Sequence, residues 1–344
     1  MIYIRADSNP VISGGHIMRC AAIARALTEA GERVCFLIAD DNPAGVLEGL
    51  GFPFFVLRSD WRDLMTDAET VRDLLRKEKD PILLIDTYSI TREYVEYLKP
   101  HARIASLGSK REYLGPLDLL INYSTDIDYD FYAASYDSRT RLLLGPAFAP
   151  LRAEFQNVIP RFRERAGRIL LTTGNTDPGH TVPTLLRELL PVLEDRGAAV
   201  DAVIGRMFED QEELHRLYDG SPSVTLHENV TSMSALMRQC DLAVSANGTT
   251  VYELSAMGLP TVSFAIVPEQ VRSALALSGL GAVDYCGRAY EEGEECIRRI
   301  VRRTAYYLDN SPARAALAER AHSLIDGNGC GKIGEALLSL RAPA

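Results

Sequence analysis

Short apolar runs alternate with segments of helical periodicity, and this alternation predicts the elements of the first half of the chain. Residues 2–6 form an apolar run typical of a buried strand, and residues 16–30 carry apolar side chains at the spacing of one helix face. The same reasoning predicts further strands at 34–39, 53–57, 82–86, 104–107, 117–122 and 141–144, and helices at 44–50, 63–79 and 91–99. Strands separated by helices of this length predict βαβ crossovers and a mostly parallel sheet.

The alternation is interrupted at 145–167, where Gly145, Pro146, Pro150 and a charged, non-periodic stretch replace it. It then resumes with strands at 169–173, 200–204, 224–226, 242–245, 261–266 and 283–285, and helices at 181–196, 210–218, 232–239, 250–257, 269–278, 291–309, 312–325 and 331–341. We therefore expect the α/β class, with two doubly wound, Rossmann-like domains that face each other across a cleft. The expected parts are a first domain (1–150), a linker (151–167), a second domain (168–310) and a helical tail (311–344) that packs back on the first domain.

Composition and charge narrow the class of protein. The 344 residues are 47% hydrophobic and 24% charged, which is ordinary for a globular protein of two domains. The net charge of −10 argues against a nucleic-acid partner. The apolar runs are far shorter than the ~20 residues of a membrane helix. Arg5 and Asp7 interrupt the first apolar stretch, so we expect neither a membrane span nor a secretory signal.

Cysteine usage and the acidic segments bear on metal binding. Six scattered cysteines without a CxxC pair are typical of buried thiols in a reducing compartment, so we expect a cytoplasmic protein without structural zinc. We also expect a monomer. The stretch 326–332 resembles a phosphate loop, but Ile333 follows its lysine and no strand precedes it. Asp126, Asp128 and Asp130 are the pattern of a metal-dependent sugar transferase, yet we predict a solvated loop there and therefore no metal site.

The loop after the first strand is the first candidate for chemistry, because ligands of open α/β sheets bind at the carboxyl ends of the strands. It runs from Ser13 to His16 and opens the first helix. Gly14 and Gly15 permit a tight turn and a close backbone approach. The helix start favours an anion and a neutral imidazole, and a neutral His16 can act as a general base. The alternative is an ordinary glycine-containing turn with a histidine near a helix start.

The segment 242–260 suggests a nucleotide site. A strand ends near Ser245, a small polar turn follows at Asn247 and Gly248, and Thr249 or Thr250 can cap the next helix. Glu253 lies about one turn inside this helix. A diphosphate at the turn, with the carboxylate on the ribose hydroxyls, fits nucleotide binding. The alternative is an ordinary capped helix with a solvated glutamate.

Two further loops follow predicted strands. The loop 172–180 is small, polar and glycine-bearing, and it either lines the cleft near a phosphate or is a simple loop in which Asp177 turns the chain before a proline. Asp86 ends the strand 82–86 and precedes Thr87 and Tyr88. A carboxylate at this place can orient a base or bind sugar hydroxyls; otherwise it caps a helix or pairs with a cation.

Taken together, these residues resemble a known family, the UDP-2,4-diacetamido-2,4,6-trideoxy-altropyranose hydrolases of pseudaminic acid synthesis, also described as spore-coat polysaccharide proteins of the SpsG type. The N-terminal signature is the specific part of the resemblance, and the other matching segments follow in the right order over nearly the whole chain. The matching segments are Arg5–Ser8 with Ile12–Cys20, Ile85–Tyr88, Leu151–Phe155, Gly174–Asp177, Val230–Met237, Ser245–Glu253 and Asp326–Gly327.

The resemblance implies a GT-B fold related to the glycosyltransferase MurG, with UDP held mainly by the C-terminal domain and neither metal nor cofactor. It implies that water attacks the anomeric carbon of a UDP-sugar and that UDP leaves with inversion. By position, His16 matches the catalytic base, Glu253 the ribose-binding carboxylate and Gly248–Thr250 the diphosphate cradle. The matching segments further imply a catalytic set of Asp7, Asp86 and Tyr88, nucleotide binding by Ser245 and Asn247, and substrate binding by Gly14, Gly15, Arg19, Arg152, Glu154, Gly174, Thr176, Asp177 and Gln270.

Three positions depart from the family pattern and leave the exact sugar open. The family's Asp-Asp pair after the fifth strand reads Gly108-Ser109, its Asn-Gln pair reads Glu269-Gln270, and its Asp-His-Tyr reads Asp86-Thr87-Tyr88. Two other functions also remain open from the sequence. One is a GT-B glycosyltransferase that uses a sugar hydroxyl in place of water, and the other is a non-catalytic nucleotide-sugar-binding protein.

Overall fold

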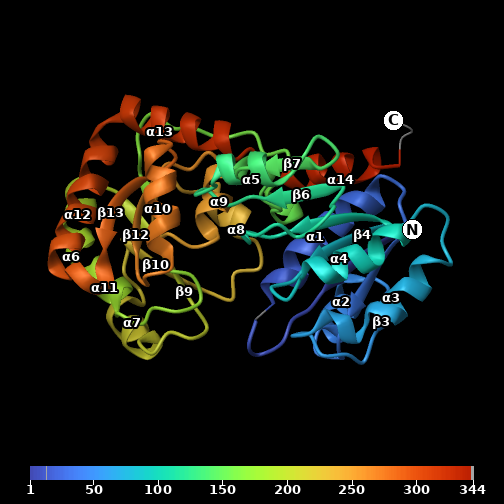
Figure 1. Cartoon of the computed structure of the whole chain (residues 1–344). Coiled ribbons are helices and arrows are strands. Elements are labelled where there is room, and N and C mark those ends of the chain that lie inside the picture. Colours follow the sequence, from blue (N-terminus) through green and yellow to red (C-terminus); the bar gives the residue numbers. More distant parts are fainter. Residues whose placement is uncertain (13, 342–344) are drawn as a thin grey trace. The chain divides into compact units, whose positions relative to one another are not determined.

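A computed structural model describes residues 1–12 and 14–341, and in it the chain folds as two compact units. Unit 1 comprises Met1–Ala153 together with Asn328–Ala344, and unit 2 comprises Glu154–Gly327. The last helix therefore belongs with the first part of the chain, as its red ribbon beside the blue-to-green elements of unit 1 shows (Figure 1). Ser13, part of the predicted first loop, and residues 342–344 of the predicted tail lie outside the described residues.

Unit 1 is built on a seven-stranded parallel sheet in the order β3-β2-β1-β4-β5-β6-β7. Its strands are β1 (Ile2–Ala6), β2 (Val34–Ile38), β3 (Phe54–Val56), β4 (Ile82–Asp86), β5 (Arg103–Leu107), β6 (Leu119–Asn122) and β7 (Arg141–Leu144). Its helices are α1 (Gly15–Glu29), α2 (Ala44–Leu50), α3 (Ala68–Leu75), α4 (Arg92–Leu98), α5 (Tyr129–Ser135) and α14 (Gly329–Ser339), with short 3₁₀ turns η1 (Leu64–Thr66), η2 (Lys99–His101) and η3 (Pro146–Phe148).

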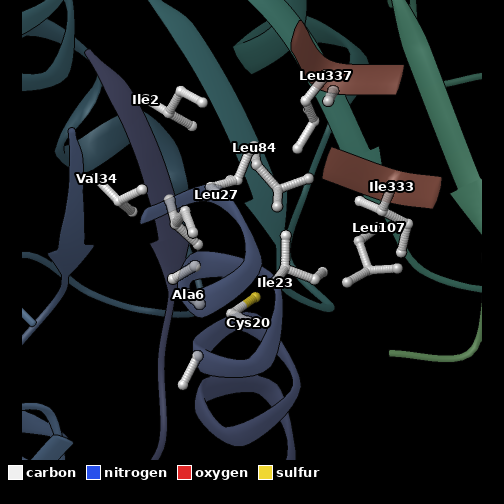
Figure 2. Packing of buried hydrophobic residues seen from close by; sticks show 14 of the residues in the cluster. Ile2, Ala6, Cys20, Ile23, Leu27, Val34, Leu84, Leu107, Ile333 and Leu337 are labelled. Carbon is white, nitrogen blue, oxygen red and sulfur yellow. The ribbon is translucent and has the colours of Figure 1, made fainter. Parts of the chain in front are cut away.

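The core of unit 1 lies on both faces of this sheet. On one face, α1 and α14 pack together, with α1 against β1 and β2 and α14 against β6, so that Ile23 and Leu27 lie on the same face as Ile333 and Leu337 (Figure 2). The other face packs against η1, α3, α4 and α5. Because both faces are covered, the strands are continuous apolar runs rather than alternating ones, which is why the sequence pattern locates them well. The C-terminal helix α14 thus helps to hold α1, the helix whose first turn carries His16.

Unit 2 is built on a six-stranded parallel sheet in the order β10-β9-β8-β11-β12-β13. Its strands are β8 (Arg168–Thr172), β9 (Ala199–Ile204), β10 (Val224–Glu228), β11 (Leu242–Ala246), β12 (Thr261–Ala265) and β13 (Asp284–Arg288). Its helices are α6 (Thr181–Asp195), α7 (Gln211–Tyr218), α8 (Met233–Met237), α9 (Thr250–Ala256), α10 (Gln270–Gly279), α11 (Ala289–Glu292), α12 (Glu294–Asp309) and α13 (Ser311–Leu324), while η4 (Ala153–Phe155) spans the start of the unit. One face of the sheet is buried by α6, α7 and α12.

The structure differs from the predicted elements at two places in unit 1. The predicted helix 63–79 is divided into η1 and α3, because Asp67 turns inward between them and accepts hydrogen bonds from Arg5 Nε, Ser59 Oγ and Tyr94 Oη. The predicted solvated loop around 126–130 instead leads into α5, where the Asp128 side chain caps the helix by accepting from the backbone N–H of Phe131 at 3.0 Å.

Both sheets reverse their strand order at one point, which lies between β1 and β4 in unit 1 and between β8 and β11 in unit 2. The connections on either side of such a point leave in opposite directions, so the carboxyl ends of the two strands open a crevice there. The candidate residues His16 and Asp86 follow or end β1 and β4. Asp177 and Asn247 follow β8 and β11. Within the described ranges, no helix is both long and apolar enough to cross a bilayer.

Candidate functional site

The first candidate site lies at the strand-order reversal of unit 1, where α1 begins beside the end of β4. Gly14 precedes the helix and Gly15 is its first residue. Neither has a positive φ, and a Cβ added to either meets no atom within 4 Å. The backbone therefore does not require glycine at these positions, and the space above this helix start is open to an approaching group.

Asp86 is the centre of this site. Its side chain is fully buried at the end of β4, on the face that α1 covers, because Asp86 pairs in register with Ala6 of β1. Oδ1 lies 2.7 Å from His16 Nδ1 and also contacts Arg19 Nη2. Oδ2 accepts from Arg19 Nε at 2.6 Å and from the Cys20 thiol at 3.3 Å. Both oxygens are thus engaged by α1, so Asp86 orients its neighbours and does not itself face a substrate.

The charge state of Asp86 follows from these contacts. Burial by itself would raise the pKa of the carboxyl, but the hydrogen bonds from Arg19 and His16 outweigh it and hold the pKa below the usual aspartate value. Asp86 is therefore ionised at neutral pH and can only accept hydrogen bonds. When Nδ1 donates to Oδ1, the lone pair of a neutral His16 lies on Nε2.

His16 Nε2 is the unusual atom of the site. His16 is 3% exposed, and Nε2 is a buried nitrogen without a hydrogen-bond partner. The imidazole ring contacts the ring of Tyr88 edge to face, with centroids 4.6 Å apart. Tyr88 is 62% exposed, so little buried surface would be lost if its ring moved aside. An oriented imidazole with an unpartnered basic nitrogen is the arrangement of a general base that awaits a proton.

Asp7 does not join this site, although the resemblance implies a catalytic role for it. It follows β1 on the opposite face of the sheet, where Arg5 pairs in register with Leu37 and Ile85. Asp7 Oδ2 accepts from Arg5 Nη1 at 2.5 Å and Oδ1 accepts from the backbone N–H of Ala39 at 2.7 Å. Both oxygens are used to hold a buried arginine and the end of β2, so the structure gives Asp7 a structural role.

The second candidate site lies at the strand-order reversal of unit 2. Asn247 is 3% exposed after β11; its Oδ1 accepts from Ser263 Oγ at 3.1 Å, and its Nδ2 is buried without a partner. On the neighbouring loop after β8, Thr173 Oγ1 and Asp177 Oδ1 are likewise buried without partners. Three unsatisfied polar atoms on two adjacent loops are unusual for a protein interior and mark a place for a polar ligand.

Asp177 also anchors the start of α6. Its Oδ2 accepts from the backbone N–H of Val182 at 2.7 Å, and burial raises the pKa of the carboxyl despite the hydrogen bonds from Val182 and Thr181. Gly174, in the same loop, adopts a φ of +94°, which favours glycine, and Thr176 is exposed. Oδ2 of Asp177 therefore has the structural role that the sequence offered as the alternative, because it holds the turn before α6. Oδ1 is the carboxylate oxygen without a partner.

The remaining predicted binding residues differ in their contacts and in their exposure. Ser245 and Gln270 have structural contacts, since Ser245 Oγ donates to the Ala246 carbonyl and Gln270 Oε1 accepts from the Ile266 N–H. Thr249 is exposed, while Gly248, Thr250 and Glu253 are half-buried at the start of α9. Glu154 Oε2 accepts from Ser232 Oγ and Ser234 N, so this carboxylate helps to cap α8. Arg152 is exposed in the other unit.

Two residues of the first site were not assigned a role from the sequence. Cys20 stands within the N-terminal signature, but its apolar surroundings in α1 suggested only a buried thiol. Tyr123 directly follows β6, and its Oη accepts from Arg19 Nη1 at 3.1 Å. Its position after a strand was the available signal, because polar residues at that edge of a parallel sheet face the ligand side.

Comparisons with known proteins match part of unit 2 and, for one relative, nearly the whole chain. A model of the family described as glycosyl transferases group 1 matches residues 167–281. The chain is 23% identical over 341 residues to the spore coat polysaccharide biosynthesis protein SpsG of Bacillus subtilis, covering 95% of this chain and 94% of SpsG. It is 24% identical over 280 residues to protein MJ1062 of Methanocaldococcus jannaschii, covering 76% of this chain and 54% of that protein.

A third relative is a Helicobacter pylori protein named pseudaminic acid cytidylyltransferase and UDP-2,4-diacetamido-2,4,6-trideoxy-beta-L-altropyranose hydrolase. The identity is 23% over 273 residues, which is 78% of this chain and 44% of that protein. The chain thus spans about half the length of two of these three relatives.

Solved structures with the same architecture include a glycosyltransferase and a protein described as a putative UDP-N-acetylglucosamine 2-epimerase. MurG of Acinetobacter baumannii superimposes with a TM-score of 0.66 at 14% identity, covering 98% of this chain and 99% of MurG. The Streptomyces sp. SF2575 glycosyltransferase SsfS6, complexed with thymidine diphosphate, gives 0.58 at 16% identity and covers 99% of both chains. The predicted fold class is confirmed: this chain has the GT-B fold of two Rossmann-like domains, and its relatives support an enzyme that acts on sugars with a nucleotide-sugar-related role.

Proposed function

We propose that the chain hydrolyses a UDP-sugar, with the base supplied by unit 1 and the nucleotide site by unit 2. The observation that carries this proposal is His16, whose Nδ1 is held by the ionised Asp86 and whose Nε2 is buried without a partner. The name of the Helicobacter pylori relative supports hydrolysis, and it supports a sugar of the 2,4-diacetamido-2,4,6-trideoxyhexose class.

The proposed reaction is a direct displacement by water. A water molecule between His16 Nε2 and the sugar gives one proton to Nε2 while its oxygen attacks the anomeric carbon. The bond between that carbon and the UDP oxygen breaks, and its electron pair stays on the diphosphate. UDP is a good leaving group, so the enzyme needs mainly to place and deprotonate one water. Because Nε2 is buried, a neighbouring side chain must move before water reaches it, and the exposed ring of Tyr88 contacts the imidazole.

The loops at the strand-order reversal of unit 2 would hold the nucleotide. Asn247 Nδ2 offers a buried donor, and the turn Gly248–Thr250 precedes Glu253 in α9. Donors of this kind stabilise the charge that develops on the departing diphosphate. The match of residues 167–281 to the group 1 glycosyl transferases supports a nucleotide-sugar site in this unit. The loss of UDP would then leave a free sugar.

A GT-B glycosyltransferase is the second candidate, and the same family match and the likeness to MurG favour it. It would use the same base and nucleotide site, with a sugar hydroxyl in place of water. Incubation with UDP-sugars in the absence of any acceptor separates the two functions. Hydrolysis predicts free sugar and UDP in equal amounts, whereas a transferase predicts turnover only when an acceptor is added. Release of neither, with UDP-sugar bound, would indicate the non-catalytic binding protein.

Glu253 tests the nucleotide site. If its carboxylate accepts hydrogen bonds from the ribose hydroxyls, the Glu253→Ala variant binds UDP about tenfold or more weakly, the scale of one or two lost charge-assisted hydrogen bonds. Calorimetric titration of UDP into both proteins measures the difference. Glu291→Ala in α11 is a matched control, because this glutamate forms an ion pair with Arg288 at the end of the edge strand β13. Equal UDP affinity of wild type and Glu253→Ala would remove Glu253 from the ribose site.

Metal removal tests the proposed stabilisation of the diphosphate. We expect hydrolysis to continue unchanged after dialysis against EDTA, because protein donors rather than a divalent cation would meet the charge of the leaving group. The rate before and after dialysis, with and without added Mg²⁺ or Mn²⁺, is the measurement. Strong inhibition that is reversed by either ion would contradict this and direct attention back to Asp126, Asp128 and Asp130.

A further inference from the structure

We propose that Arg19 is a positioning residue that keeps His16 neutral by offsetting the charge of Asp86, and that it does not bind the substrate. This inference rests on the proposed function, in which a neutral His16 takes a proton from water. It departs from the substrate-binding role that the sequence resemblance implies for Arg19.

The guanidinium of Arg19 is occupied by the protein. Nε donates to Asp86 Oδ2 at 2.6 Å, Nη2 contacts Asp86 Oδ1, and Nη1 donates to Tyr123 Oη at 3.1 Å. The first two contacts form the planar, two-pronged pair for which a guanidinium is suited. All three nitrogens therefore have a partner in unit 1, and these contacts use three of the five N–H groups of the guanidinium.

Arg19 also lies beside the base itself. Its Nη2 is 2.9 Å from His16 Nδ1, so a full positive charge lies as close to the imidazole as the negative charge of Asp86 does. The other titratable groups around His16 are the Cys20 thiol, the Tyr123 phenol and the Tyr88 ring. Burial raises the pKa of Cys20 and of Tyr123, so both are uncharged at neutral pH. The charges that face His16 are therefore one negative and one positive.

This balance has a direct consequence for a base. A histidine paired with a carboxylate alone is stabilised as imidazolium, and an imidazolium cannot accept a proton. The adjacent Arg19 opposes that protonation, yet its contacts with both carboxylate oxygens leave Asp86 oriented to hold Nδ1–H. Removing the guanidinium takes away the positive charge that opposes Asp86, and it should therefore make His16 easier to protonate.

The experiment is the pH dependence of kcat/KM for wild type and Arg19→Gln. We expect the acid limb of the Arg19→Gln profile to move to higher pH by about one unit, the scale of one nearby charge, with activity recovering towards wild type at alkaline pH. A substrate-binding role predicts instead a higher KM at every pH with the acid limb in place. A purely structural role predicts a uniform loss of rate. Either result would overturn the proposal.

Two further variants act as controls. Arg25→Gln removes an exposed positive charge from the same helix, where Arg25 stacks on Phe52, and should leave the profile unchanged. Arg19→Lys keeps the charge without the two-pronged geometry, so its acid limb should stay near that of wild type even if the rate falls. An acid limb of Arg19→Lys that shifts as far as that of Arg19→Gln would contradict the charge argument.

Nitrogen NMR of the histidine side chains provides a readout that does not depend on catalysis, with the His16→Asn spectrum used to identify the His16 signal. We expect a neutral, Nδ1-protonated imidazole in wild type at pH 7.5, and a titration midpoint about one pH unit higher in Arg19→Gln. A cationic or Nε2-protonated His16 in wild type would overturn the proposal even if Arg19→Gln fails to fold. If no UDP-sugar is hydrolysed but the midpoint shifts as expected, the proposed function fails while the role of Arg19 stands.

Discussion

The His16→Asn variant should hydrolyse UDP-sugar at least ~100-fold more slowly than wild type, the usual scale of a lost general base, while its affinity for UDP is unchanged. Asparagine is close to the imidazole in size near the backbone, and its amide nitrogen can still donate to Asp86, so the local fold has a replacement for the Nδ1 contact. It has no basic nitrogen at the position of Nε2. The loss should therefore fall on kcat, because the variant lacks only the group that takes the proton from water.

Steady-state kinetics and calorimetric titration of UDP measure the two quantities on the same preparations. His101→Asn is a matched control, since His101 lies in η2 just before β5. It is therefore at the amino ends of the strands, whereas His16 and Asp86 lie at the carboxyl ends of β1 and β4. It should retain wild-type turnover. Full activity of His16→Asn would show that another group deprotonates the water, and a parallel loss of UDP affinity would show that the substitution disturbs more than the base.

The Asp86→Asn variant should lose about 10²- to 10⁴-fold in kcat, because the proton of His16 is then directed to the wrong nitrogen. The ionised Asp86 can only accept, and it therefore requires Nδ1–H. An asparagine amide can donate to Nδ1 and so favour the tautomer with the proton on Nε2, which cannot act as a base. The imidazole and the guanidinium of Arg19 would also lose their shared negative partner.

The same substitution should reduce stability at neutral pH. The folded protein lowers the pKa of Asp86, so its ionisation stabilises the fold above the usual aspartate pKa, and this contribution is lost as the pH falls through the lowered value. Thermal unfolding should therefore show a larger gap between wild type and Asp86→Asn at pH 7 than at strongly acidic pH. Asp118→Asn is a matched control: Asp118 accepts from Lys99 and from the Ile104 N–H, so it should affect stability but not turnover. Wild-type kcat in Asp86→Asn would contradict the tautomer argument.

The pattern of apolar residues was sufficient to predict most elements, because parallel strands covered on both faces are continuous apolar runs and the crossover helices have one apolar stripe. It was also sufficient to place His16, Asp86, Asp177 and Asn247 after strands. It did not reveal α5, whose short sequence begins among aspartates, since one of those aspartates is the helix cap. It also did not reveal the break before α3, because the inward turn of Asp67 depends on a partner 62 residues away.

The contacts within the site were decided only by the tertiary structure. His16 and Asp86 are separated by 70 positions, and they meet because β1 and β4 are neighbours in a register that aligns Ala6 with Asp86. The same register places Asp7 on the other face, although the sequence brings it closer to His16 than Asp86 is. Local patterns determine which residues follow a strand. Which of them meet depends on strand order and on the side of the sheet that each side chain faces, and these are set by pairing between distant segments.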